Sequence, residues 1–152
     1  MSDNPLRSPP NRLMIRLYRA GRGHIIGRII LLLTTTGRKT GLPRVTPLQY
    51  EEVDGAICVG SARGQRADWF RNVLAKPRVQ VQVGGRRFAG AAEAVTDPVR
   101  IADFLELRLR RHPRLVGRIL ESQGLPPHPS RAELEAYAGR LAMVVIRPVV
   151  SQ

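Results

Sequence analysis

The sequence predicts an α+β protein with a mainly β core, formed as a small closed or half-closed barrel of about six mostly antiparallel strands with surrounding helices. Two pairs of strand-like segments are joined by the tight turns Asp54-Gly55 and Gly84-Gly85, which is the pattern of β-hairpins. A last strand-like segment, 141–146, follows a long helical stretch, so its strand partners must lie far away in the sequence. This combination favours a barrel.

Length and composition indicate one globular domain, which we assign to residues 11–152 after a flexible, proline-rich lead-in at 1–10. Hydrophobic residues make up 43% of the chain and charged residues 24%, which argues against wholesale disorder. No apolar run approaches the roughly 20 residues that a bilayer requires, and the N-terminus lacks a signal-peptide pattern, so the cytoplasm is the expected compartment. No spacing of Cys and His resembles a metal site.

The chain is strongly basic, with a net charge of +13, of which residues 1–50 carry +8. A field of this sign attracts nucleic acid, an anionic membrane, or a phosphorylated or polycarboxylate small molecule. Specific nucleic-acid binding is disfavoured because aromatic residues are only 5% of the chain and no recognition-helix or zinc-finger motif appears. Residues 11–20 place arginines on one helical face and apolar residues on another. Packing of this helix on the domain is favoured, and peripheral membrane contact is the alternative.

The first half of the domain alternates strands with tight turns. Pro47 predicts an edge or a bulge in the second strand, because proline has no N–H to donate to a ladder. Asp68 lies near the start of the first helix, where a carboxylate favours the helix dipole, and Pro77 ends that helix. Strands are expected at 29–36, 44–50 and 56–60, and a helix at 67–76.

The second half combines a hairpin, helices and a closing strand. Valines alternate with glutamines over 79–83, which is typical of a half-buried strand. Asp97 and Pro98 suit the N-cap and first position of a helix, and Ser130 with Glu133 forms a capping box for another. A strand is also expected at 86–95, with helices from 98 to about 112, over 114–122 and after Ser130.

The densest signal of a binding site is the segment 34–44, Thr-Thr-Thr-Gly-Arg-Lys-Thr-Gly-Leu-Pro-Arg. Two glycines bound a turn that offers backbone N–H groups, hydroxyls and the cations Arg38, Lys39 and Arg44. Guanidinium groups match phosphate or carboxylate oxygens in pairs, so this turn is a candidate anion site. It is not a P-loop, because a strand rather than a helix follows it. An exposed, solvated turn is the alternative.

A second signal lies at 61–72, where small residues at a strand end precede the only tryptophan. Trp69 and Phe70 either form the wall of a pocket or belong to the core, and Asn72 fixes a helix end or a substrate. Catalytic side chains are scarce elsewhere. Cys58 lies in an apolar strand and is expected to be inert, and Glu51 with Glu52 suggests a solvated hairpin tip. A bound cofactor is therefore expected to carry any reaction.

The run 32–48, continued by Ser61, by Trp69-Phe70-Arg71-Asn72 and by 76–83, resembles the deazaflavin (F420)-dependent nitroreductase and quinone reductase family. The resemblance covers about residues 27–90, and 98–140 match poorly. It implies a split β-barrel, related to flavin-binding barrels, that holds coenzyme F420, an 8-hydroxy-5-deazaflavin with a phosphate and a polyglutamate tail. The implied reaction is hydride transfer from the reduced coenzyme to a quinone or a nitroaromatic compound.

The resemblance also implies residue roles. The phosphate or tail would be held by Arg38, Lys39, Thr40 and Arg44. The ring would be lined by Val45, Thr46, Pro47 and Leu48, and its other edge would be closed by Ser61, Ala62 and Arg63. The place where ring and substrate meet would be formed by Trp69, Phe70 and Asn72. The family's nitroreductases carry several substrate-facing tyrosines near the C-terminus, where this chain offers only Tyr137. That difference weakens the expectation of nitroimidazole reduction.

Two alternatives to this enzyme stay open at the level of sequence. One is a split barrel that binds FMN in place of the deazaflavin. The other is a basic module that binds polyanions or membranes without catalysis, whose affinity would fall steeply with salt. The sequence leaves both a monomer and a homodimer open; split barrels often pair through their open side.

Overall fold

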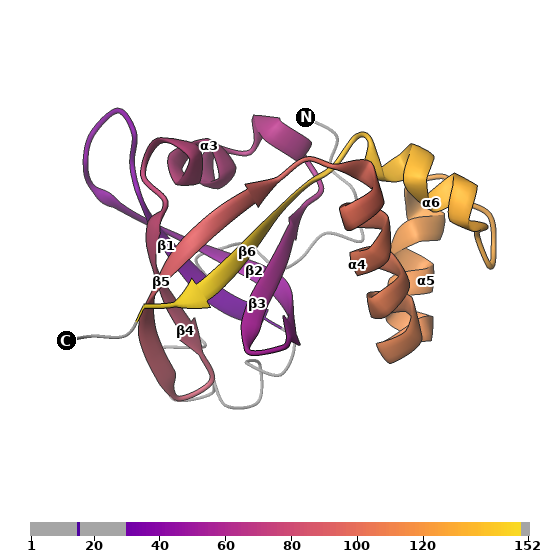
Figure 1. Ribbon diagram of the computed structural model, residues 1–152, viewed down its shortest axis with the longest axis horizontal. Coiled ribbons are helices and arrows are strands. Elements are labelled where there is room, and N and C mark those ends of the chain that lie inside the picture. The colour runs from indigo at the N-terminus through magenta and orange to yellow at the C-terminus, as the bar shows by residue number, and fades with distance from the viewer. Residues whose placement is uncertain (1–14, 16–29, 150–152) are drawn as a thin grey trace.

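Six antiparallel strands close into a barrel in the order β1-β2-β3-β6-β5-β4 within the part of the chain that the structure describes (Figure 1). The computed structural model describes residue 15 and residues 30–149. The predicted lead-in at 1–10, and the predicted helix at 11–20 except Ile15, lie outside that part. The strands are β1 (Ile30–Thr36), β2 (Pro43–Val53), β3 (Ala56–Ser61), β4 (Arg78–Val83), β5 (Arg86–Val95) and β6 (Ala142–Pro148). The predicted α+β barrel is confirmed.

The helices flank the barrel on two sides (Figure 1). A 3-10 turn, η2 (Gly64–Arg66), leads into α3 (Asp68–Ala75). On another side, α4 (Pro98–Arg111), α5 (Pro113–Ser122) and α6 (Arg131–Ala138) pack together, and we call these three helices the helical lobe. None of the described helices has the length and apolar character needed to traverse a bilayer.

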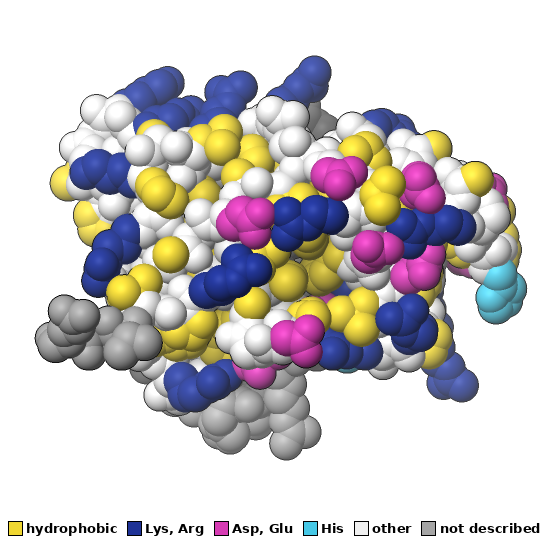
Figure 2. Space-filling view, viewed as in Figure 1, with side chains coloured by type: hydrophobic (Ala, Val, Ile, Leu, Met, Phe, Trp, Pro, Cys, Tyr) yellow, Lys and Arg dark blue, Asp and Glu magenta, His cyan; other side chains and the backbone are white. Residues whose placement is uncertain are grey.

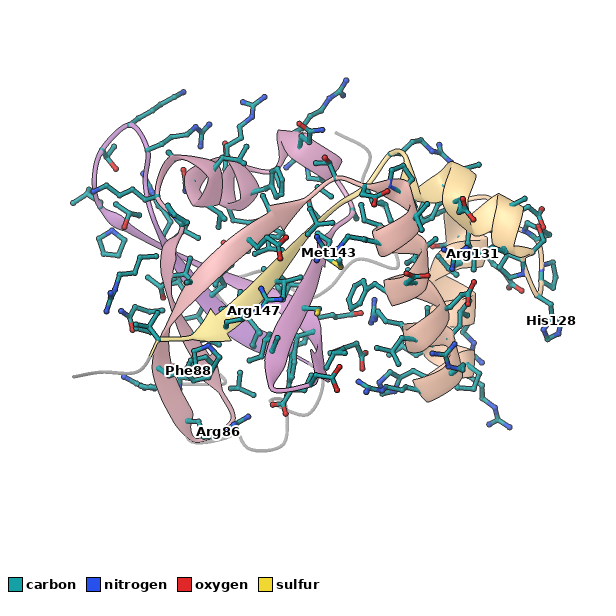
Figure 3. All side chains as sticks on the ribbon, in the orientation of Figure 1. Arg86, Phe88, His128, Arg131, Met143 and Arg147 are labelled. Atoms are coloured by element: carbon teal, nitrogen blue, oxygen red, sulfur yellow. The ribbon has the colours of Figure 1, made fainter. Side chains whose placement is uncertain are left out.

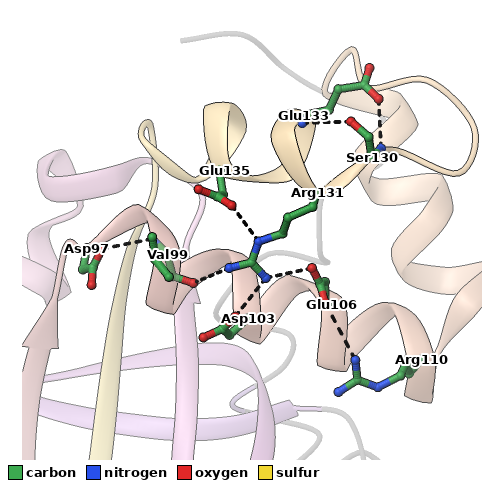
Figure 4. A network of polar contacts seen from close by, with 9 residues as sticks. All are labelled: Asp97, Val99, Asp103, Glu106, Arg110, Ser130, Arg131, Glu133 and Glu135. Carbon is green, nitrogen blue, oxygen red and sulfur yellow. Dashed lines mark hydrogen bonds and ion pairs between the residues drawn. The ribbon is translucent and has the colours of Figure 1, made fainter.

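Helix caps and the contacts of Arg131 stabilise the helical lobe. The Asp97 side chain accepts from the Val99 backbone N–H at the start of α4, and the predicted capping box of Ser130 and Glu133 starts α6. Arg131 on α6 ion-pairs with Asp103 and Glu106 on α4, at 2.8 and 2.7 Å, and donates to the Val99 carbonyl (Figure 4). These contacts tie α6 to α4 side by side.

Two hydrophobic clusters share β3 and β6 because side chains alternate between the faces of a strand. Ile57 and Val59 of β3 point into the barrel, whereas Ala56 and Cys58 pack under the helical lobe. On β6, Val144 faces the barrel interior, and Val145 faces the lobe. Met143 also lies on the side of the lobe (Figure 3). Both strands are therefore buried on two faces, which explains their continuous apolar runs.

The thiol of Cys58 is expected to be unreactive in the folded protein. Burial raises the pKa of this thiol above its ordinary value, so less thiolate is present at neutral pH. We expect a thiol-reactive chromogenic disulfide to modify Cys58 slowly in native protein and rapidly in concentrated urea. Because the sequence holds one cysteine, the signal reports this site alone. Equal rates in the two conditions would contradict the burial of Cys58.

The barrel opens between β2 and β3. Residues 43–49 of β2 pair with β1, and the pairing of β2 with β3 is confined, among the described residues, to 50–53. The first half of β2 is therefore an edge, and Pro47 lies in it opposite Leu32 of β1. The predicted edge at Pro47 is confirmed, although the strand runs on through it without interruption. The separation of β2 from β3 leaves space for a cleft along β2.

Candidate functional site

A cleft of about 990 Å³ lies along the free edge of β2. One side is formed by the turn 37–40 and by residues 43–49, and the opposite side by residues 60–63 and the start of α3. The helical lobe closes its remaining wall. Pockets that bind cofactors and small molecules commonly have volumes of roughly 300–1,000 Å³, so this cleft is large enough for a cofactor with a substrate.

The glycine turn between β1 and β2 has a backbone that favours glycine at two positions. The Gly37 N–H donates to the Leu42 carbonyl at 2.8 Å, and the Gly41 N–H donates to the Gly37 carbonyl at 2.7 Å. A Cβ at Gly37 would lie 2.8 Å from Thr40 Oγ1 and 3.1 Å from the Leu42 carbonyl oxygen. Gly41 has a φ of 73°, in the left-handed region. Hydrogen bonds within the turn and its two glycines therefore stabilise its conformation.

Asn72 of α3 fastens this turn to the barrel. Its Nδ2 donates to Thr35 Oγ1 at 3.2 Å, and its Oδ1 accepts from the Arg38 backbone N–H at 3.2 Å and from Arg38 Nη1 at 2.9 Å. Asn72 is only 4% exposed. Arg38 Nη2 also pairs with Asp68 at 3.1 Å, which lowers the pKa of that carboxyl below its ordinary value. Arg38 and Asn72 thus position the turn.

Three further cations border the cleft. Among the described residues, Lys39, Arg44 and Arg63 form no ion pair, and all three are exposed. Figure 2 shows basic side chains gathered along the edge of the molecule above α3. Cations that are not paired within the protein remain available to an anionic ligand.

The wall that the helical lobe and β6 contribute is mainly apolar. Phe104 of α4, Ile119 of α5, Tyr137 of α6 and Met143 of β6 line it. Burial raises the pKa of Tyr137 above its ordinary value, so its hydroxyl stays protonated at neutral pH. Trp69, 8% exposed, also lines the cleft and meets Phe70 edge to face, with ring centroids 6.1 Å apart. A flat apolar ligand can therefore lie between the cationic turn and the lobe.

The structure gathers nearly all the predicted site residues in this one cleft. Phe70 is the exception: it is 0% exposed and packs inside the barrel, so its predicted place facing a substrate is wrong. The Ser61 hydroxyl donates to the Gly64 carbonyl at 2.8 Å and so shapes the loop. The predicted site residues that line the cleft are Arg38, Lys39, Thr40, Arg44, Val45, Thr46, Pro47, Leu48, Ser61, Ala62, Arg63, Trp69, Asn72 and Tyr137.

Sequence reasoning missed the residues that the lobe and the middle of β2 contribute. Gln49, Phe104, Arg108, Ile119 and Met143 also line the cleft. The helices expected over 98–122 did not indicate which residues they bring to the cleft. Glu51 was also misjudged: it is 5% exposed and binds Arg108, Arg111 and His112, whereas Glu52 is exposed as predicted.

Comparison with known proteins agrees with this geometry. An F420H(2)-dependent quinone reductase of Mycobacterium tuberculosis (strain H37Rv) is 37% identical over 92 residues, which cover 55% of this chain and 62% of that protein. The chain thus matches less than two thirds of the length of this relative. The solved structure of an F420-H2 dependent reductase is 26% identical, with a TM-score of 0.52, and covers 78% of this chain and 94% of its own.

Another solved structure, described as a domain-swapped dimer, is 26% identical with a TM-score of 0.55, and covers 91% of this chain and 98% of its own. A pyridoxamine 5'-phosphate oxidase-related, FMN binding protein from Nostoc punctiforme is 16% identical with a TM-score of 0.52 over 95% of this chain and 82% of its own, and shares the fold alone. The sequence pattern of one family matches residues 11–116, more than two thirds of the chain. By that match, this chain belongs to the F420H(2)-dependent quinone reductase family.

Proposed function

We propose that this protein is an oxidoreductase that uses reduced coenzyme F420 to reduce a quinone, or a nitroaromatic compound, in the cleft beside β2. One observation carries the proposal: a single cleft joins the cationic glycine turn to an apolar wall that holds the only tryptophan. The family match and the lining of the cleft both support hydride transfer from the reduced coenzyme.

The residues present fit this coenzyme. Its phosphate and polyglutamate tail are anionic, and Lys39, Arg44 and Arg63 are unpaired cations among the described residues at the rim of the cleft. Its ring is flat, and the part of β2 that does not pair with β3 among the described residues, which includes Pro47, lies along the same cleft.

When bound, the reduced coenzyme supplies a hydride, that is, two electrons and a proton. The protein would contribute binding and orientation. Lys39 and Arg44 would hold the anionic tail, and the edge of β2 with Trp69 would hold the ring and the acceptor against each other. Orientation of two reactants in one site can supply roughly 7–11 kcal/mol of a barrier. The lobe would exclude water, which strengthens each electrostatic contact in the cleft.

The proposal is tested by titrating the coenzyme against the intact protein and following its fluorescence. We expect a dissociation constant in the micromolar range or tighter, and about tenfold weaker binding for Lys39→Ala, because a charge-assisted contact is lost. Lys76→Ala is the matched control: it removes the only other lysine, which is exposed and lies outside the cleft. It should bind as the parent protein does.

The same assay separates the alternatives. Tighter binding of FMN than of the deazaflavin, or equal binding by the parent and Lys39→Ala, would overturn the proposed site. Equal affinity for any polyanion, without turnover of quinones such as menadione, would favour the non-catalytic module. A homodimer, a cytoplasmic location and membrane contact through residues 11–20 stay predictions; the structure describes only Ile15 of that segment.

A further inference from the structure

One cation lies at the apolar end of the cleft, apart from the glycine turn. Arg108 of α4 lines the cleft next to Gln49 of β2, and its side chain is only 13% exposed. The Phe104 ring lies beside its guanidinium, and Ile119 and Leu120 line the same cleft. A buried cation at a ligand-sized cleft is costly to maintain and calls for an explanation.

Arg108 is held at three points. Its Nε donates to Glu51 Oε2 at 3.3 Å, its Nη2 donates to Gln49 Oε1 at 2.6 Å, and its guanidinium carbon lies 6.0 Å from the Phe104 ring centroid. Its Nη1 makes no hydrogen bond within the described residues. Every fully buried side-chain nitrogen of those residues has a hydrogen-bond partner, so Nη1 is not fully buried. Nη1 therefore remains accessible, on a side chain that lines the cleft.

The local charges do not cancel. Glu51 is the carboxylate that Arg108 binds, but the same carboxylate also accepts from Arg111 Nη1 at 3.2 Å, and His112 Nε2 lies 3.3 Å from it. One negative charge therefore faces two guanidinium groups. Burial lowers the pKa of Arg108 below its ordinary value, while Glu51 raises it, and an arginine remains charged at neutral pH. The apolar end of the cleft thus carries excess positive charge.

We propose that Arg108 binds an oxygen of the acceptor and stabilises the negative charge that develops there during reduction. This inference rests on the proposed function. A quinone that accepts one hydride becomes a hydroquinone monoanion, and its charged oxygen then takes a proton from water. Nη1 is a donor fixed in advance in a low-dielectric site, where such a donor is most effective. Glu51 and Gln49 act as positioning residues for it.

The first test needs no coenzyme, so its outcome is independent of the proposed function. Quenching of Trp69, the only tryptophan, reports binding of 2-hydroxy-1,4-naphthoquinone, an anion at neutral pH, and of neutral menadione. We expect Arg108→Gln to weaken binding of the anion by about tenfold or more, and that of menadione by no more than about threefold, because a charge-assisted hydrogen bond is lost. Near-UV and thermal unfolding signals verify the fold.

Arg111→Gln is the matched control, because it removes the other guanidinium on Glu51 but does not line the cleft. It should weaken binding of the anion far less than Arg108→Gln does, because it lowers the local positive charge but removes no donor that lines the cleft. Should Arg108→Gln fail to fold, Gln49→Glu keeps Arg108 and places a carboxylate beside its Nη2. We expect this variant to lose about tenfold in affinity for the anion alone, because the guanidinium charge is then neutralised.

Turnover with the reduced coenzyme then separates binding from catalysis. We expect Arg108→Gln to lower kcat by about 100-fold with the KM of the coenzyme unchanged, and Arg108→Lys to restore part of the loss, since removal of one stabilising donor has effects of this size. Equal losses in Arg108→Gln and Arg111→Gln, or equal losses for the two quinones, would assign Arg108 a purely structural role and overturn the inference.

Discussion

Replacing Glu51 with alanine is expected to lower the free energy of unfolding by about 3 kcal/mol, because it leaves the buried Arg108 guanidinium without its counter-charge. Glu51 is 5% exposed and joins β2 to three basic groups, Arg108, Arg111 and His112, at the end of α4. The loss therefore affects the attachment of the helical lobe to the barrel. Equilibrium unfolding in urea, followed by far-UV circular dichroism, measures it.

The neighbouring residue provides the control. Glu52 pairs with Arg86 at 2.6 Å, but both side chains are more than half exposed, at 51% and 65%. Exposed ion pairs contribute roughly 0–1 kcal/mol, so Glu52→Ala should shift the unfolding midpoint only slightly. Equal destabilisation by the two variants would mean that Glu51 is not the buried connection between β2 and α4.

Asn72→Ala is expected to cost about 2–3 kcal/mol of stability, because the Thr35 hydroxyl and two donors of Arg38 lose a buried partner. It should also weaken coenzyme binding by about tenfold or more, since the turn that carries Lys39 is no longer held to α3. Thermal unfolding and the fluorescence titration measure the two effects on the same sample.

Leu74→Ala is the matched change on the same helix. Leu74 is 57% exposed and lies outside the cleft, so its loss should change stability by less than about 0.5 kcal/mol and leave coenzyme affinity intact. If Asn72→Ala destabilises the protein but binds the coenzyme normally, then the turn does not depend on Asn72, and the positioning role assigned here is wrong.

The residues that sequence predicted well are those whose signal is local. The hairpins at Asp54-Gly55 and Gly84-Gly85 and the capping box at Ser130 each depend on residues within four positions of one another. The glycine turn is local as well, since its hydrogen bonds join Gly37 to Gly41 and Leu42, at most five positions away. For such features the chain segment itself contains both partners, and short-range backbone geometry leaves few alternatives.

The errors concern burial, which no short segment determines. Phe70 and Trp69 are adjacent on α3, yet Phe70 is buried inside the barrel and Trp69 also reaches the cleft. Glu51 lies two residues before Val53 at a hairpin, where a solvated carboxylate is the ordinary expectation. It is buried because α4 brings Arg108, 57 residues later in the sequence, against it.

The sequence by itself determined the strands, the cationic turn and the family, because alternation, turn chemistry and motif spacing are properties of consecutive residues. Only the tertiary structure decided that β2 parts from β3 at residue 49, that Asn72 anchors the turn, and that the lobe supplies Arg108 to the far wall. These features arise where elements distant in the chain pack together, and packing is set by the shape and charge of both surfaces at once.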